Sequence, residues 1–322
     1  MKSLSVLALF GALMLSSSDS HAQVKKSHLD AQSAGPDFQV QGEYVGKIGT
    51  DTVLGAQVIA LGSGKFDAVL HAGGLPGAGW DGKTKVELTG ETSDGVTHFT
   101  GRNFKGRIQD GTFAGTAEDG VLFELNRIVR RSPTLEAAPP EEALVLFDGS
   151  GNSEWAEGPI EDGNLLGVAA RTKKKFQDFT LHLEFRTPFM PNARGQGRGN
   201  SGMYLLDQYE CQVLDSFGLT GENNECGGIY QIAKPRVNMC LPPLSWQTYD
   251  VEFKAARFDE SGNKTQNAVT TIRHNGVVIH ENLSLPRITP GGAQSDERPG
   301  ALFLQHHGDP VRYRNIWVVE HR

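Results

Sequence analysis

The sequence predicts an all-β protein, and three observations support this prediction. The 322-residue chain contains 39 glycines and few aromatic residues, a balance that suits short strands and tight turns better than long helices. Apolar and polar residues alternate over many short runs, as they do along half-buried strands. In the second half of the chain, no segment repeats its apolar residues every 3.6 positions over a useful length, so no amphipathic helix is expected there.

The first 22 residues have the three parts of a secretory signal peptide. Met1-Lys2 precede the apolar run Leu4–Leu15, and Ser20-His21-Ala22 supplies the cleavage site. We therefore expect an exported mature protein that begins at Gln23. The apolar run is shorter than the roughly 20 residues that span a bilayer. Because no cysteine follows the cleavage point before Cys211, we expect no membrane anchor either.

The charge of the chain argues against a nucleic-acid partner. Its formal net charge is -7, and no part of it is strongly basic. The short run Lys173–Lys175 is typical of a solvated turn. A nucleotide cofactor is not expected either, because the glycine-rich segment 195–199 lacks the strand and helix that flank a phosphate-binding loop.

A small β domain is predicted over residues 38–130, after a polar, flexible lead-in over residues 23–37. Asp94-Gly95, Asp110-Gly111 and Asp119-Gly120 favour the left-handed turns of hairpins. We therefore predict a small antiparallel barrel or sandwich, of unassigned role. The predicted strands are Val40–Val45, Val53–Ala60, Phe66–Leu70, Lys85–Leu88, Thr97–Phe99, Phe113–Ala117 and Val121–Ile128.

A linker over residues 131–142 separates this domain from a second one over residues 143–322. The linker contains three prolines among Ala and Glu, which predicts a stiff, extended connector. In the second domain, Phe179–Arg186 has the cleanest alternation of the chain, and Asn275-Gly276 predicts a type I′ hairpin turn. These patterns predict a jelly roll of two packed sheets, one of them concave and polar.

The hairpin at residues 200–215 is the centre of the predicted site. In Tyr209–Asp215 an apolar face alternates with a polar face that carries Glu210 and Gln212. A two-residue loop would place Glu210 opposite Leu205, whereas a three-residue loop, 206–208, would place it opposite Tyr204. We favour the three-residue loop because Tyr204 suits a wall that faces a sugar.

Export permits disulfides, and three cysteines leave at least one unpaired. Cys211 points to the apolar face of its strand, so we expect a buried, unreactive thiol there. The remaining pair, Cys226 and Cys240, is predicted to form a disulfide.

An ordered series of motifs in residues 143–322 resembles the 3-keto-disaccharide hydrolase domain family. The resemblance implies a concanavalin-like jelly roll, export from a bacterium to the periplasm or the medium, and action on glycosides oxidised at C3 of a glucose unit. Leu206 and His306 depart from residues that are common in the family. The motifs are Leu146–Gly149, Glu184–Arg186, Asn200–Gly202, Tyr209–Ser216, Gly227–Tyr230, Trp246–Tyr249, His274–Gly276, Leu304–Gly308 and Arg314–Ile316.

A ketone at C3 suggests how such a glycoside is cleaved. The ketone acidifies the hydrogen on C2, so a base can remove it and the C1 substituent can leave by elimination, with water adding later. This route needs a general base, an acid and a stabiliser for the developing oxyanion. Ordinary glycoside hydrolysis instead needs two carboxylates about 5–5.5 Å or 6.5–9.5 Å apart. Glu184 and Glu210 would suit either route, and we place elimination first.

The candidate residues follow from these requirements. Glu210, Glu184 and His307 are the candidate catalytic acid and base. No cofactor is called for, although a divalent metal that binds the enediolate stays open. The rival interpretation is a non-catalytic, lectin-like carbohydrate-binding protein, which would have little use for several ionisable groups in one pocket. The candidate substrate-binding residues are Arg186, Asn200, Tyr204, Gln212, Asn238 and Gln305.

Overall fold

The fold is described from a computed structural model, which places residues 26–296 and 299–321. The predicted signal peptide lies outside the described residues. The structure is nearly all-β, as the sequence predicts, with one short α-helix, α1 (Pro36–Val40), and two 3-10 turns, η1 (Glu118–Gly120) and η2 (Gly195–Gly197). Within the described part of the chain, no helix is long and apolar enough to cross a membrane.

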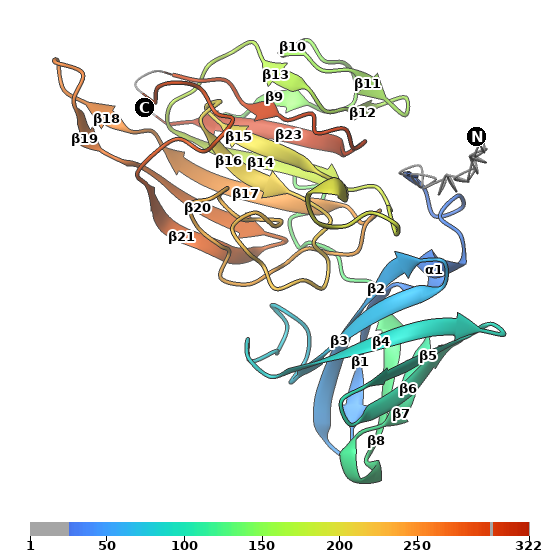
Figure 1. The fold of residues 1–322 in the computed structure, drawn as a ribbon. Helices are drawn as coiled ribbons and strands as arrows, with labels where there is room; N and C mark the ends of the chain where they lie inside the picture. The colour runs from blue at the N-terminus through green and yellow to red at the C-terminus, as the bar shows by residue number, and fades with distance from the viewer. Residues whose placement is uncertain (1–25, 297–298, 322) are drawn as a thin grey trace, which may run out of the picture.

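The first domain is a closed eight-stranded antiparallel barrel, so of the two predicted architectures the barrel is correct (Figure 1). Each strand pairs with the next, and the last pairs with the first. Asp94 and Asp110, together with the glycines that follow them, have positive φ angles, which confirms two of the predicted turns. The strands are β1 (Gly42–Ile48), β2 (Thr52–Gly62), β3 (Lys65–Ala72), β4 (Lys85–Ser93), β5 (Val96–Gly101), β6 (Phe104–Gln109), β7 (Thr112–Thr116) and β8 (Leu122–Ile128).

The described part of the predicted lead-in, from residue 26, contacts both domains. The backbone of His28 exchanges hydrogen bonds of 3.0 and 2.9 Å with Phe189 of the second domain. Ala34 is buried in the same cluster as Phe189 and the barrel core. Polar composition alone concealed these contacts, because the pairing uses backbone groups.

The second domain is a sandwich of two antiparallel sheets, confirming the predicted jelly-roll class (Figure 1). The five-stranded sheet has the order β10 (Trp155–Glu157), β13 (Ala170–Thr172), β22 (Phe303–Leu304), β15 (Ser201–Leu205), β16 (Tyr209–Val213). The other sheet runs β11 (Ile160–Glu161), β12 (Leu165–Leu166), β23 (Arg312–Glu320), β14 (Phe179–Arg186), β17 (Gln247–Lys254), β20 (Ala268–His274), β21 (Val277–Leu285). We call it the long sheet; β9 (Leu144–Phe147) pairs with its strand β23, and β18 (Arg257–Phe258) and β19 (Lys264–Gln266) form a separate pair.

The core of the sandwich fixes which side chains face outward. Leu181, Leu183 and Phe185 of β14 belong to the same buried cluster as Cys211 and Val213 of β16. Because successive side chains of a strand point to opposite faces, the polar residues between them point away from this core. The polar residues of β14 and those of β16 therefore lie on opposite outer faces of the sandwich.

The barrel contacts the sandwich directly. Ile59 and Val69 of the barrel join the buried cluster of the sandwich. Two arginines of the sandwich reach barrel carbonyls: Arg198 donates to Ala60 O at 3.0 Å, and Arg194 donates to Leu61 O at 2.8 Å. The two domains thus share both apolar and polar contacts.

Candidate active site on the five-stranded sheet

The hairpin β15–β16 has the register that the sequence favoured. Tyr204 pairs with Glu210, and Gly202 pairs with Gln212. The loop between the strands consists of residues 206–208, and its first two residues, Leu206 and Asp207, have φ angles of 56° and 63°. The three-residue loop is therefore confirmed, and it places Glu210 beside Tyr204 on the outer face of the sheet.

Glu210 is a buried acid whose carboxyl accepts one hydrogen bond from a tyrosine hydroxyl. Its side chain is 3% exposed, and Tyr204 Oη donates to its Oε2 at 2.9 Å. Burial disfavours the charged form and raises the pKa of Glu210 to about 7, although the Tyr204 hydrogen bond acts in the other direction. A carboxyl with this pKa is present both as acid and as base near neutral pH, which a proton-transfer group requires.

Glycine at position 202 makes room for this carboxyl. A Cβ atom built on Gly202 would lie 2.3 Å from Glu210 Oε1, far inside contact distance. The motif Asn200-Ser201-Gly202 thus contributes more than a turn, because its last residue lies under the acid. The backbone N–H of Glu210 donates to Thr289 Oγ1 at 3.0 Å, which fixes the strand from the other side.

Amide side chains surround Glu210. Gln305 Nε2 donates to Tyr204 Oη at 3.4 Å, and Gln212 Nε2 donates to Gln196 Oε1 at 3.3 Å. Asn200 Nδ2 donates to Gln196 O at 2.7 Å. The side-chain oxygens of Asn200, Gln212 and Gln305 are buried and have no hydrogen-bond partner among the described residues. Buried acceptors of this kind are normally paired, so these three suit the hydroxyl groups of a ligand.

Three residues in this region were not predicted from the sequence: Gln196, Phe303 and Arg171. Gln196 lies in the glycine-rich segment that the sequence excluded as a phosphate loop, and its side chain connects Asn200 with Gln212. Phe303 pairs with Tyr204 across β22 and β15, and the Arg171 guanidinium lies 4.1 Å from the centre of its ring. Strands β13 and β22 have only three and two residues, too few for alternation to reveal a face.

Two predicted site residues, Asn238 and His307, do not belong to the hydrogen-bonded group around Glu210. The Asn238 side chain donates to Ser216 O at 2.8 Å and to Leu219 O at 3.0 Å, and its oxygen accepts the Cys240 N–H at 3.0 Å. These bonds hold a loop and occupy both amide protons, so a sugar-binding role for Asn238 is not supported. His307 is exposed, two residues after Gln305, whose N–H donates to Gly202 O at 2.8 Å.

Glu184 lies on the long sheet and is not a partner of Glu210. It is fully buried, accepts from Arg314 Nε at 2.7 Å and Asn315 Nδ2 at 3.0 Å, and also accepts the backbone N–H of Glu136. Burial alone would raise its pKa, but hydrogen bonds from His182, Asn315, Glu136 and Arg314 hold it at about 2. The prediction that Glu184 and Glu210 flank one glycosidic bond is therefore wrong. Alternation showed that each lies on a polar face but not on which sheet.

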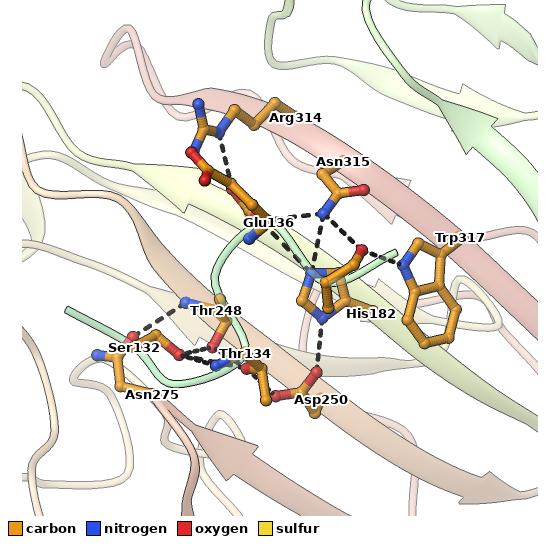
Figure 2. Close-up of polar contacts among 12 residues, drawn as sticks. Ser132, Thr134, Glu136, His182, Thr248, Asp250, Asn275, Arg314, Asn315 and Trp317 are labelled. Atoms are coloured by element: carbon orange, nitrogen blue, oxygen red, sulfur yellow. Dashed lines mark hydrogen bonds and ion pairs between the residues drawn. The ribbon is translucent and has the colours of Figure 1, made fainter. Parts of the chain in front are cut away.

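The outward-facing polar residues of β14 and of its neighbour β17 bind the linker, which we call the strap (residues 131–142). Ser132 Oγ lies 2.6 Å from Thr248 Oγ1, and Thr134 Oγ1 donates to Asp250 Oδ2 at 2.7 Å (Figure 2). His182 Nδ1 is 2.6 Å from Asp250 Oδ1. Burial lowers the pKa of His182, but the hydrogen bonds to Asp250 and Glu184 outweigh this and raise it. These polar residues therefore contact the chain's own linker.

The comparisons with known proteins identify the sandwich. A family model described as the 3-keto-alpha-glucoside-1,2-lyase-like domain matches residues 142–319. The chain belongs to this family. The barrel and nearly all of the strap lie outside the match. No curated protein matches the chain.

Solved structures resemble the same family domain. One, from Parabacteroides distasonis and described as a candidate glycosyl hydrolase, is 32% identical, covers 56% of this chain and 85% of its own, and has a TM-score of 0.50. Two more from the same organism, described in the same way, are each 18% identical. They cover 57% and 56% of this chain and 99% and 100% of their own, with TM-scores of 0.42 and 0.38.

The cysteines of this family member are all free thiols. Cys211, Cys226 and Cys240 are buried and unbridged, so the structure does not contain the predicted Cys226–Cys240 disulfide. Cys226 Sγ lies 3.3 Å from Tyr249 Oη, and Cys240 Sγ donates to Leu214 O at 3.4 Å, so each sulfur has a polar neighbour inside the core. Burial raises the pKa of the Cys211 thiol, as expected for an unreactive core residue.

Among residues 26–296 and 299–321, no three His, Cys, Asp or Glu side chains come together as a group that would hold a metal ion. The groups around Glu210 are instead a tyrosine and amides.

Proposed function

We propose that this chain is an enzyme that cleaves glycosides carrying a ketone at C3 of a glucose unit, with Glu210 as the general base. The observation that carries the proposal is the buried Glu210 carboxyl, whose pKa is raised to about 7 on the outer face of the five-stranded sheet. Membership in the 3-keto-alpha-glucoside-1,2-lyase-like domain family supports the substrate class.

The reaction proposed is an elimination across C1 and C2. Ionised Glu210 removes the proton from C2, and the electron pair forms the enediolate with the C3 oxygen. That pair then forms the C1–C2 double bond as the C3 ketone returns and the C1–O bond breaks. The leaving oxygen takes up a proton, and water can add to the unsaturated sugar afterwards. No oxidant or reductant is consumed.

The neighbours of Glu210 supply the other functions. Tyr204 Oη is a hydrogen-bond donor 2.9 Å from the carboxyl, so a substrate oxygen that takes the carboxyl's place would receive this bond. Burial, with the nearby Glu210 charge, raises the pKa of Tyr204, which keeps the hydroxyl protonated. The amides of Gln212, Gln305 and Asn200 bind sugar hydroxyls. His307, exposed near Gln305, is the candidate acid for the leaving group.

Elimination is favoured over direct hydrolysis because the second predicted carboxylate is elsewhere. Glu184 faces the strap on the opposite surface of the sandwich. A single base adjacent to hydrogen-bond donors matches the needs of proton abstraction, whereas direct hydrolysis needs two carboxylates across the bond. Tyr204 Oη also lies 3.2 Å from Pro290 O, so the segment around Pro290 packs against the proposed donor.

The test is turnover of a 3-keto disaccharide and of its unoxidised form. We expect cleavage of the keto sugar only, and a loss of about 10²–10⁴-fold in Glu210→Gln, which keeps shape but cannot abstract a proton. Glu281→Gln, which changes an exposed carboxylate paired with Arg236, is the matched control and should keep full activity. With deuterium at C2 the rate should fall if proton abstraction limits it, and recovered substrate should exchange C2 hydrogen with solvent. An unaltered rate in Glu210→Gln would contradict the proposal; binding without turnover would favour the lectin-like interpretation.

A further inference from the structure

A second pocket lies on the other side of the sandwich, between the strap and the long sheet. Its volume is about 550 Å³, within the range of small-molecule sites. The strap residues 136–139 form one wall, and Arg186, Trp246 and Arg314 form another. Asp148 and Asn164 contribute polar groups from the segments that precede β10 and β12.

Arg186 is the unusual group in this pocket. It is half-buried, and within the part of the chain that the structure describes it has no hydrogen bond or ion pair. Its guanidinium carbon lies 5.0 Å from the centre of the Trp246 ring, and that of Arg314 lies 4.3 Å from the same ring. Burial, together with the charges of Arg312 and Arg314, lowers the pKa of Arg186. The fold therefore holds a half-buried cation against Trp246 without a hydrogen bond or an ion pair.

Of the three arginines in this region, Arg186 is the one that no acid pairs with in the described part of the chain. Arg314 is paired with Glu184 at 2.7 Å and Glu136 at 3.3 Å. Arg312 is paired with two acids of the β11 hairpin, at 2.8 and 3.4 Å. Asp162 and Asp30 attract Arg186 from a distance, but neither pairs with it. A half-buried guanidinium of this kind favours binding of an anion.

We propose that this pocket binds a small monocarboxylate that carries hydroxyl groups, the chemistry of a sugar acid such as a uronate or an aldonate. The planar fork of Arg186 matches one carboxylate with two parallel hydrogen bonds. The single positive charge of Arg186 matches the single negative charge of a carboxylate. A phosphate or sulfate would place its second negative charge near the acids Asp148 and Glu136. Asn164 and Asp148 are partners for hydroxyl groups. The inference does not rest on the proposed function, because the pocket lies on the face opposite Glu210.

The test measures binding of glucuronate to the full chain by calorimetry, with glucose, acetate and phosphate as comparison ligands. We expect glucuronate to bind and Arg186→Gln to weaken it by roughly tenfold or more, because the bidentate pair is lost. Arg186→Lys keeps the charge without the fork and should fall between the two. Arg236→Gln, which removes an exposed arginine paired with Glu281, is the matched control and should bind normally.

Other outcomes would overturn the proposal. These are no binding of glucuronate, equal binding in Arg186→Gln, binding of glucose with the same affinity, or binding of phosphate at least as tight as that of glucuronate. Glu210→Gln should bind glucuronate as the parent does; if it does not, the ligand occupies the active-site face and the assignment to this pocket is wrong. A circular-dichroism melt of each variant establishes that it is folded. A failure of glucuronate binding would leave the keto-sugar assay of Glu210 unaffected, so each proposal can be refuted without the other.

Discussion

Replacing Glu210 with glutamine should stabilise the protein above neutral pH while it removes the proposed catalytic base. The buried carboxyl titrates near 7 in the folded chain, against 4.5 for a free side chain. Between these values the folded state holds a proton that the unfolded state has released. The free energy of unfolding therefore falls as pH rises through this window, and the penalty is fully present above about pH 7.

The magnitude follows from the two titration points. A difference from 4.5 to about 7, at about 1.4 kcal/mol per pH unit, gives a penalty of roughly 3 kcal/mol for ionised Glu210. Glutamine carries no charge at any pH, and its oxygen can still accept the Tyr204 hydrogen bond. Any cost of burying the extra amide protons is the same at every pH. It therefore cancels when the difference between variant and parent is compared at two pH values.

Urea unfolding at about pH 5 and about pH 8.5 measures this difference. Three of the four tryptophans, Trp155, Trp246 and Trp317, lie in the sandwich, so their fluorescence reports mainly on the domain that holds Glu210. We expect the variant to gain about 2–3 kcal/mol relative to the parent between the two conditions. The same stability difference at both pH values would refute an elevated pKa for Glu210. Glu281→Gln, at an exposed position, should show no such pH dependence.

Two further substitutions test the two faces of the sandwich. Gly202→Ala should push the Glu210 carboxyl aside, since its Cβ would lie 2.3 Å from Oε1, and kcat/KM on a keto sugar should fall by about 10²-fold with the fold intact; parental kinetics would contradict this. In Glu184→Gln, the acid limb of a pH-unfolding curve should be shallower between about pH 4.5 and 2, because the pKa of Glu184 is held at about 2 and the stability that its charge supplies in the parent is lost over that range. An acid limb with the same slope in variant and parent would show that Glu184 does not supply this stability.

The sequence predicted the local geometry around Glu210 because that geometry depends on neighbours in the chain. Period-two alternation assigned Glu210 and Gln212 to one face but left two registers open, of which the one with Tyr204 opposite Glu210 was preferred as a sugar-facing wall and is the one observed. The type I′ turn at Asn275-Gly276 was predictable for the same reason, and both residues have positive φ angles. Local rules of this kind need no knowledge of the rest of the fold.

The sequence could not predict relations between distant segments. Glu184 and Arg186 alternate as cleanly as Glu210 and Gln212, but sheet membership depends on long-range pairing that alternation does not encode. Strand β6 was missed for a related reason. Its run Phe104–Gln109 contains a glycine and two basic residues, and it is held as a strand by hydrogen bonds to β5 and β7 on either side.

The strap has a consequence for how this protein divides into parts. The match to the family model begins at residue 142, yet Ser132, Thr134 and Glu136 satisfy polar groups of the long sheet from outside that boundary. Excising the sandwich at the limit of the match would uncover His182 and Glu184, which the intact chain keeps fully buried. The part of the chain that the family model matches and the part that satisfies the buried polar groups of the long sheet therefore differ here by one short segment, the strap.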